Sequence, residues 1–178
     1  MWLLYPIFSI LIRSSAKAPP SEGLGRLFQL MTTTLPITIQ AIEDDGFHLL
    51  TTIQINGKDA LLIIDTGASR SVFDETRIVD FIGHNNLTEQ DKLSSGLGTN
   101  TMTSKKVVLE HLNLNGLMLS NYEATLLNLH HVNQSYQKIG LSPIDGILGG
   151  EILHDYHAII DYKNSRLVLC HSEPVEEY

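Results

Sequence analysis

A short stretch in the first half of the chain constrains the fold more than any other. Residues 61–64 (Leu-Leu-Ile-Ile) run directly into Asp65, and Thr66-Gly67-Ala68-Ser69 follow. An apolar run of this length predicts a strand buried on both faces, so we expect the carboxylate where the strand ends. Glycine allows a tight turn there, and the two hydroxyls can donate hydrogen bonds to the carboxylate or its loop. Because these are also ordinary turn residues, the stretch alone fits either a functional turn or a plain one.

The remaining pattern is that of a β-protein. Apolar residues alternate from Leu35 onward, and Asn56-Gly57 is the strongest signal for a hairpin with a type I′ turn. Strands are expected near residues 35–41, 47–55, 60–64, 71–73, 107–114, 117–129, 157–162 and 166–170, with short helical segments near 75–82, 133–139 and up to about 156. Many short strands with one or two short helices predict a closed all-β barrel.

Residues 93–108 are rich in glycine and hydroxyl side chains, with Gly96, Leu97, Gly98 and Thr99 at their centre. This composition favours a hairpin with an exposed tip, although an ordinary surface loop fits equally well.

A second glycine-containing motif lies near the C-terminus. Ile147 and Leu148 precede the paired glycines Gly149-Gly150, and glycines allow another backbone to approach closely. The preceding Asp145-Gly146 has no hydroxyl residue between aspartate and glycine, unlike Asp65-Thr66-Gly67. We therefore expect a turn role for Asp145.

Composition indicates a compact globular protein and argues against several functions. The chain has 178 residues, of which 43% are hydrophobic and 18% charged, and this predicts one domain with appendages. A net charge of −8 without a basic run argues against a nucleic-acid partner. The single cysteine, Cys170, cannot form an intramolecular disulfide and is expected to be a small core residue. No Cys or His spacing suggests a metal site, and no cofactor is expected.

Both ends of the chain are expected to lie outside the folded domain. The apolar residues 1–12 are shorter than the ~20 residues that a membrane-spanning helix needs. No positive charge precedes them, as one would in a signal peptide. They are either a weak membrane anchor or, preferably, part of a non-native extension ahead of a start at Met31, which would make the protein cytoplasmic. The expected division is 1–30 for the apolar segment and linker, 31–172 for the domain and 173–178 for a loose acidic tail.

Together these motifs resemble the retropepsin-like aspartic proteases, the single-domain relatives of pepsin. Asp65-Thr66-Gly67-Ala68-Ser69 after an aliphatic strand is similar to the catalytic turn of that family. Ile147-Leu148-Gly149 is similar to its second signature, a strand that passes close to the catalytic loop. Residues 158–162 (Ala-Ile-Ile-Asp-Tyr) resemble the closing strand of bacterial members. The resemblance covers about residues 35–170. The spacing between motifs exceeds that of the compact viral members, which predicts insertions within 75–92 or 120–140.

The resemblance implies an aspartic endopeptidase that cleaves peptide or protein substrates. Because the chain has one Asp-Thr-Gly, it implies a homodimer in which Asp65 is catalytic and faces its copy across a two-fold axis. By the same resemblance, Thr66 would hydrogen-bond across the axis and Ser69 would support the loop. Gly67 and Ala68 would place backbone groups near carboxylates and substrate. Gly96, Leu97, Gly98 and Thr99 fall where the family places the flap that closes over an extended peptide.

The chemistry itself explains why two carboxylates are needed. One must be ionised to accept a proton from water, and the other must be protonated to hydrogen-bond the carbonyl oxygen of the substrate. Like charges so close cannot both ionise, so the pair shares a proton, as in aspartic proteases generally. Two alternatives are a non-catalytic binding or assembly module with the same fold, and a phosphate loop of an actin-like ATPase. The chain is too short and too rich in strands for the ATPase.

Overall fold

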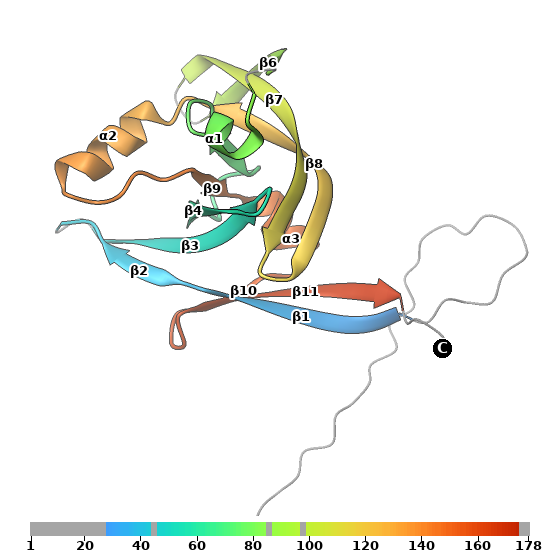
Figure 1. The fold of residues 1–178 in the computed structure, drawn as a ribbon. Coiled ribbons are helices and arrows are strands. Elements are labelled where there is room, and N and C mark those ends of the chain that lie inside the picture. The colour runs from blue at the N-terminus through green and yellow to red at the C-terminus, as the bar shows by residue number, and fades with distance from the viewer. Residues whose placement is uncertain (1–27, 44–45, 85–86, 97–98, 175–178) are drawn as a thin grey trace, which may run out of the picture.

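The computed structural model describes residues 28–174 apart from 44–45, 85–86 and 97–98 (Figure 1). Predictions for residues 1–27 and 175–178, including the apolar segment 1–12, therefore lie outside the described residues. In chain order the elements are β1 (Phe28–Pro36), β2 (Thr38–Ala41), β3 (Phe47–Ile55), β4 (Lys58–Ile64), β5 (Val72–Asp74), α1 (Ile78–Ile82), β6 (Thr88–Gly96), β7 (Thr99–Leu114), β8 (Leu117–Leu127), α2 (His130–Lys138), β9 (Gly146–Leu148), α3 (Gly150–Asp155), β10 (Ile159–Asp161) and β11 (Arg166–Pro174).

Six strands close into a barrel, which confirms the predicted all-β fold. The order β3-β4-β9-β5-β8-β7 runs around the barrel, and pairing between β3 and β7 closes it. β2 continues the sheet beyond β3, and β6 continues it beyond β7. Most neighbouring strands are antiparallel, but β4 pairs with β9 in parallel, as does β5 with β8. The parallel pair brings the carboxyl ends of β4 and β9 to the same edge of the barrel, where the candidate site lies.

Two Asn-Gly turns form tight hairpins of the barrel. Asn56 and Gly57 join β3 to β4 with φ angles of 49° and 80°, and Asn115 and Gly116 join β7 to β8 with 54° and 107°. Positive φ at both central residues is the signature of the type I′ turn, whose twist matches that of the flanking strands. The predicted hairpin at Asn56-Gly57 is therefore confirmed, and it delivers β4 toward Asp65.

The barrel interior is filled by aliphatic side chains from all its walls. Period-two alternation places every second residue of β4 inside, because successive side chains of a strand point to opposite faces. Burying each such side chain contributes about 1.5–3 kcal/mol relative to leaving it in water. Members of this core that are almost fully buried are Leu35, Ile53, Ile55, Leu62, Phe73, Leu109, Leu112, Leu126 and Leu148.

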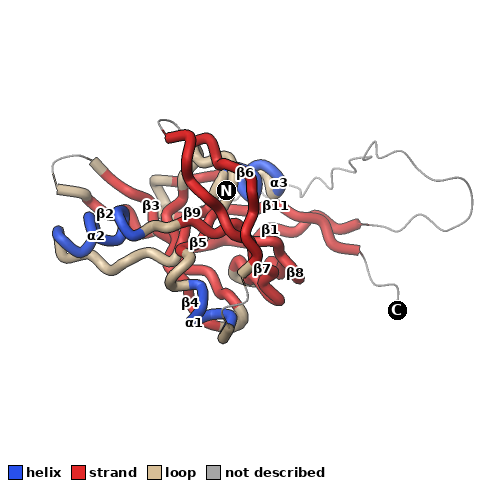
Figure 2. Tube along the Cα trace, turned by 90° about the horizontal axis from the view of Figure 1, so that it is seen from above, coloured by secondary structure: helices blue, strands red, loops and turns tan. Residues whose placement is uncertain are grey.

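A second sheet, in the order β1-β11-β10, joins the two ends of the described chain. Figure 1 shows β1 and β11 side by side beneath the barrel, and in Figure 2 this pair extends away from it on the side opposite α2. The ladder pairs Phe28 with Pro174, so it begins three residues before Met31 and ends two residues after Ser172. The expected division of the chain into residues 1–30, 31–172 and 173–178 stays a prediction. The predicted terminal hairpin is present, with β10 paired to β11.

The described residues contain three short helices, each in or beside one of the three segments expected to be helical. α2 has nine residues and begins at His130, three residues before the predicted start. It covers a second apolar cluster made by Leu50, Leu129, Tyr136 and Ile144. None of the helices in the described part of the chain is long and apolar enough to cross a membrane.

Candidate active site

Asp65 lies directly after β4, at the edge of the barrel where β9 also ends. β4 and β9 pair in parallel with Ile63 opposite Ile147 and Ile64 opposite Leu148. The backbone N–H of Asp65 continues this ladder by donating a hydrogen bond of 3.0 Å to the carbonyl oxygen of Leu148. The side chain of Asp65 is exposed in the single chain. The sheet thus holds the backbone of Asp65 and leaves its carboxylate free to meet another molecule.

The turn after Asp65 points a backbone donor at its carboxylate. The N–H of Gly67 donates to Oδ1 of Asp65 at 2.8 Å, and the N–H of Ala68 donates to the Asp65 carbonyl oxygen at 3.3 Å. A Cβ on Gly67 would lie 3.2 Å from the same Oδ1, so a larger residue there would require the carboxylate to shift by a few tenths of an ångström. The hydrogen bond from Gly67 fixes the orientation of the carboxylate, while Thr66 and Ser69 are exposed beside it.

The glycine pair after β9 packs backbone against backbone on the same turn. A Cβ on Gly149 would lie 2.3 Å from the carbonyl carbon of Arg70 and 2.6 Å from the nitrogen of Ser71, a clash that no side chain could relieve. Gly150 donates its N–H to the carbonyl oxygen of Ala68 at 2.7 Å. Ile147 and Leu148 therefore belong to the strand beside β4, and the two glycines bring that segment into direct contact with the turn.

Three polar residues behind the turn were not singled out from the sequence: Ser71, Tyr122 and Glu151. Ser71 is only 2% exposed; its N–H donates to both carboxylate oxygens of Glu151, at 2.8 and 2.7 Å, and its Oγ accepts the N–H of Gly149 at 2.8 Å. Tyr122 donates its hydroxyl to Oε1 of Glu151 at 3.0 Å. Burial, with a further contribution from the negative charge of Glu151, raises the pKa of the Tyr122 hydroxyl. A carboxylate inside the otherwise apolar stretch 147–153 was the one available signal.

Asp145 is buried and holds other parts of the chain together, and it is not part of the site around Asp65. It is 6% exposed, its Oδ1 accepts a charged hydrogen bond from Nε of Arg77 at 2.6 Å, and its Oδ2 accepts the N–H of Leu61 at 2.8 Å. Both oxygens are thus engaged with groups of the same chain. A buried carboxylate with these partners cannot serve as the second acid beside Asp65 without breaking the bonds that hold β4 and β9 together.

The proposed flap segment forms a hairpin. β6 and β7 pair antiparallel, and Gly96 opposite Thr99 is the last pair before the tip. Leu97 and Gly98 lie outside the described residues. Figure 1 shows this hairpin at the end of the barrel away from β1 and β11.

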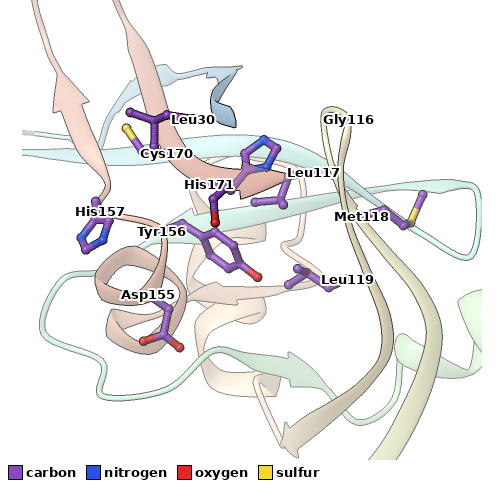
Figure 3. A pocket seen from close by; sticks show the side chains of 11 residues that line it. Leu30, Gly116, Leu117, Met118, Leu119, Asp155, Tyr156, His157, Cys170 and His171 are labelled. Atoms are coloured by element: carbon purple, nitrogen blue, oxygen red, sulfur yellow. The ribbon is translucent and has the colours of Figure 1, made fainter. Parts of the chain in front are cut away.

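Two hollows among the described residues are not lined by Asp65. The first, of about 470 Å³, lies between the start of β8 and the segment from α3 to β11. In Figure 3 the Tyr156 ring lies within this hollow, with Leu117 and Leu119 of β8 across from it. Cys170 is half-buried at its wall rather than in the core, which corrects its predicted place. No group of three or more His, Cys, Asp or Glu side chains in the described part of the chain is arranged to hold a metal ion.

Comparison with known proteins identifies the family. The family described as aspartyl protease matches residues 51–152, which include β4, the Asp65 turn, β9 and the start of α3. The chain therefore belongs to the aspartyl protease family, and its fold is that of the retropepsin-like members.

Two solved structures illustrate the likeness. A retropepsin-like aspartic protease from Rickettsia conorii is 15% identical, with a TM-score of 0.51 over 86% of this chain and 100% of that one. The retroviral protease-like domain of Ddi1 from Leishmania major is also 15% identical, with a TM-score of 0.45 over 68% of this chain and 87% of that one. No curated protein sequence matches the chain.

Proposed function

We propose that this protein is an aspartic endopeptidase whose active site is completed by a second copy of the chain. The observation that carries the proposal is the state of Asp65: its backbone is tied to Leu148, Gly67 orients its carboxylate, and the carboxylate is exposed in the single chain. A held but uncovered carboxylate at the end of a strand is suited to meeting an identical group across a two-fold axis.

We infer that the second carboxylate comes from a second copy of the chain. The sequence has one Asp-Thr-Gly, and Asp145 of the Asp145-Gly146 pair has its oxygens bound to Arg77 and Leu61. Glu151 is the acidic residue tied to the turn, and its oxygens bind Ser71 and Tyr122. A symmetric pair of Asp65 residues can form without breaking the hydrogen bonds of Asp145 or of Glu151.

The proposed reaction uses the pair of Asp65 residues and one water molecule. The ionised carboxylate accepts a proton from water while the resulting hydroxide equivalent forms a bond to the peptide carbon. The protonated carboxyl group donates its hydrogen to the carbonyl oxygen, where negative charge develops. Collapse of the tetrahedral intermediate breaks the C–N bond, and the leaving nitrogen takes a proton from the pair. The products are a carboxylic acid and an amine, and the two carboxyl groups again share one proton.

The surrounding residues have supporting roles in this proposal. Thr66 would hydrogen-bond to its counterpart's loop across the axis, Gly67 and Ala68 would present backbone groups to the substrate, and Ser69 would support the turn. The hairpin of β6 and β7, with Gly96, Leu97, Gly98 and Thr99 at its tip, would cover an extended peptide by strand-like pairing. Such a cover excludes bulk water from the carboxylates but retains the one water molecule that reacts. This strengthens each electrostatic contact.

The test compares the full-length chain with Asp65→Asn and with a matched control, Asp155→Asn, which replaces an exposed aspartate that contacts the neighbouring His154. A broad peptide library reports cleavage, and sedimentation reports mass. We expect dimers in all three and loss of cleavage in Asp65→Asn alone. Cleavage by Asp65→Asn would overturn the proposal. So would a monomeric wild type that cleaves nothing, which would instead favour a binding module with this fold.

A further inference from the structure

The catalytic turn is held at several points by one short segment of chain. Leu148 accepts the N–H of Asp65, Gly150 donates to Ala68, and Gly149 donates to the Ser71 hydroxyl. These contacts are made by backbone groups of the second signature, so they depend on shape and not on side-chain identity. The next residue, Glu151, adds the one contact in this segment that a side chain makes.

The Glu151 carboxylate accepts a hydrogen bond from the backbone N–H of Ser71, which is shielded from water. Ser71 is 2% exposed, and its N–H lies 2.8 and 2.7 Å from the two carboxylate oxygens. Bonds of this length to an ionised acceptor are stronger than those between neutral groups. Without Glu151 the N–H would be buried and unpaired, which is unfavourable enough to make the backbone move. The chain therefore relies on this carboxylate to keep the exit of the turn in place.

Tyr122 in turn fixes the position of the Glu151 carboxylate. Its hydroxyl donates to Oε1 of Glu151 at 3.0 Å, and its ring packs edge-on against Phe73 with centroids 6.5 Å apart. Glu151 itself is anchored in the first turn of α3, and the neighbouring Ile152 is buried in the barrel core. The carboxylate is thus fixed by a helix on one side and by β8 on the other.

We propose that Glu151 is a positioning residue for the catalytic turn: it clamps the exit at Ser71, as Leu148 clamps the entry at Asp65. This proposal rests on the proposed function of Asp65. Glu151 acts through Ser71 and contacts neither substrate nor the reacting carboxylates. Because the reacting groups must be placed to within a fraction of an ångström, loosening one end of the turn lowers the rate of the chemical step more than it weakens substrate binding.

The experiment compares full-length Glu151→Gln and Tyr122→Phe with the control Tyr136→Phe. The control also removes a phenol hydroxyl, 2.7 Å from Nδ1 of His48 under α2. Three quantities are measured: kcat and KM with a peptide substrate, amide exchange of Ser71 and Gly67 by NMR, and the thermal midpoint. We expect Glu151→Gln to lower kcat about tenfold with KM within about twofold, and to speed exchange of the Ser71 amide about tenfold. Tyr122→Phe should also lower kcat and speed exchange of the Ser71 amide, but by a smaller factor than Glu151→Gln. Tyr136→Phe should leave kcat and the exchange rate of the Ser71 amide unchanged, whether or not it lowers the thermal midpoint.

Two results would overturn the inference. One is unchanged Ser71 exchange in Glu151→Gln, and the other is a kcat loss in Tyr136→Phe equal to that in Glu151→Gln, which would mean that general destabilisation is the cause. The exchange measurement does not depend on catalysis. An inactive wild type would therefore count against the role of Asp65. The exchange of the Ser71 amide would still test whether Glu151 holds the turn in place.

Discussion

Asp65 and Leu148 are joined by a backbone hydrogen bond of 3.0 Å from the amide of the first to the carbonyl oxygen of the second. This bond continues the parallel ladder of β4 and β9 by one step beyond Ile64, so the residue after β4 is positioned by the last residue of β9. The two signatures of the family therefore form one structural unit. Changes in the second signature should act on the first.

Gly149→Ala tests how closely the two signatures pack. A Cβ would lie 2.3–2.6 Å from backbone atoms of Arg70 and Ser71, and the backbone on both sides is held by hydrogen bonds. We expect a loss of about 3 kcal/mol in the free energy of unfolding, with loss of cleavage, because the turn must shift to make room. Urea denaturation measures the loss.

Gly57→Ala is the comparison for this prediction. Gly57 has a φ of 80° and open space around its Cβ position, so its replacement strains the backbone without a clash. We expect Gly57→Ala to lower the free energy of unfolding by about 1 kcal/mol and to retain cleavage. An equal, small effect at both positions would mean that Gly149 has more room than the structure indicates.

Asp145→Asn tests whether this buried aspartate is structural. The substitution keeps the size of the side chain and removes the charge that pairs with Arg77 at 2.6 Å. We expect a loss of about 2 kcal/mol in the free energy of unfolding, since the buried member of the pair loses its charge beside a half-exposed arginine. Cleavage should be unchanged below the unfolding transition. Asp161→Asn, at the end of β10, is the matched control for loss of an aspartate charge beside an arginine, because Asp161 is half-buried and its partner Arg166 is exposed. A stable Asp145→Asn protein without activity would make Asp145 a catalytic carboxylate and contradict the homodimeric site.

Local patterns predicted the parts of the fold that are local in sequence. Asn56-Gly57 carries its own turn geometry, and the apolar run before Asp65 marks a buried strand regardless of what lies beside it. The same holds for Gly149, because a glycine next to large aliphatic residues already indicates a close approach, although not the atoms that approach.

The features missed from the sequence are those decided by distant partners. Ser71 and Glu151 lie 80 residues apart, and a serine after a turn and a glutamate in a first helical turn are each ordinary by themselves. β1 begins at Phe28 because it pairs with β11 at the other end of the chain, and the polar run Thr32-Thr33-Thr34 gives no alternation to reveal it. Pairing with a distant strand overrides a weak local pattern.

Tyr122 predicts how stability depends on pH in the alkaline range. Burial raises the pKa of its hydroxyl in the folded state, while the unfolded chain titrates at the ordinary value. Above about pH 10 the unfolded state therefore binds fewer protons than the folded state, and stability falls as pH rises, by at most about 1.4 kcal/mol per pH unit and less because the ring is partly solvated.

The measurement is the free energy of unfolding between pH 8 and about 11.5 for wild type and Tyr122→Phe. We expect the wild-type curve to fall more steeply above about pH 10, while the variant lacks this contribution. Parallel curves would show that the hydroxyl ionises as easily in the folded protein as in the unfolded chain.

A pair of Asp65 residues predicts a rate that falls on both sides of an acidic to near-neutral optimum. The reaction needs one ionised and one protonated carboxyl group, so it stops when both are protonated and again when both are ionised. Initial rates of the full-length protein against pH, at saturating and at low peptide concentration, check this. Circular dichroism at each pH separates titration of the pair from unfolding. A rate that rises steadily into the alkaline range would contradict a shared proton.

An active site assembled from two chains predicts that specific activity depends on protein concentration. Each chain supplies one Asp65 with an exposed carboxylate, so a dissociated chain has half a site and no route to activate water. On dilution below the dissociation constant of the dimer, the rate should fall with the square of protein concentration. Adding excess Asp65→Asn protein should then inhibit the wild type, because mixed dimers hold a single carboxylate. Asp155→Asn added in the same excess should instead raise the rate. A rate strictly proportional to wild-type concentration, and insensitive to the Asp65→Asn protein, would place the complete site within one chain.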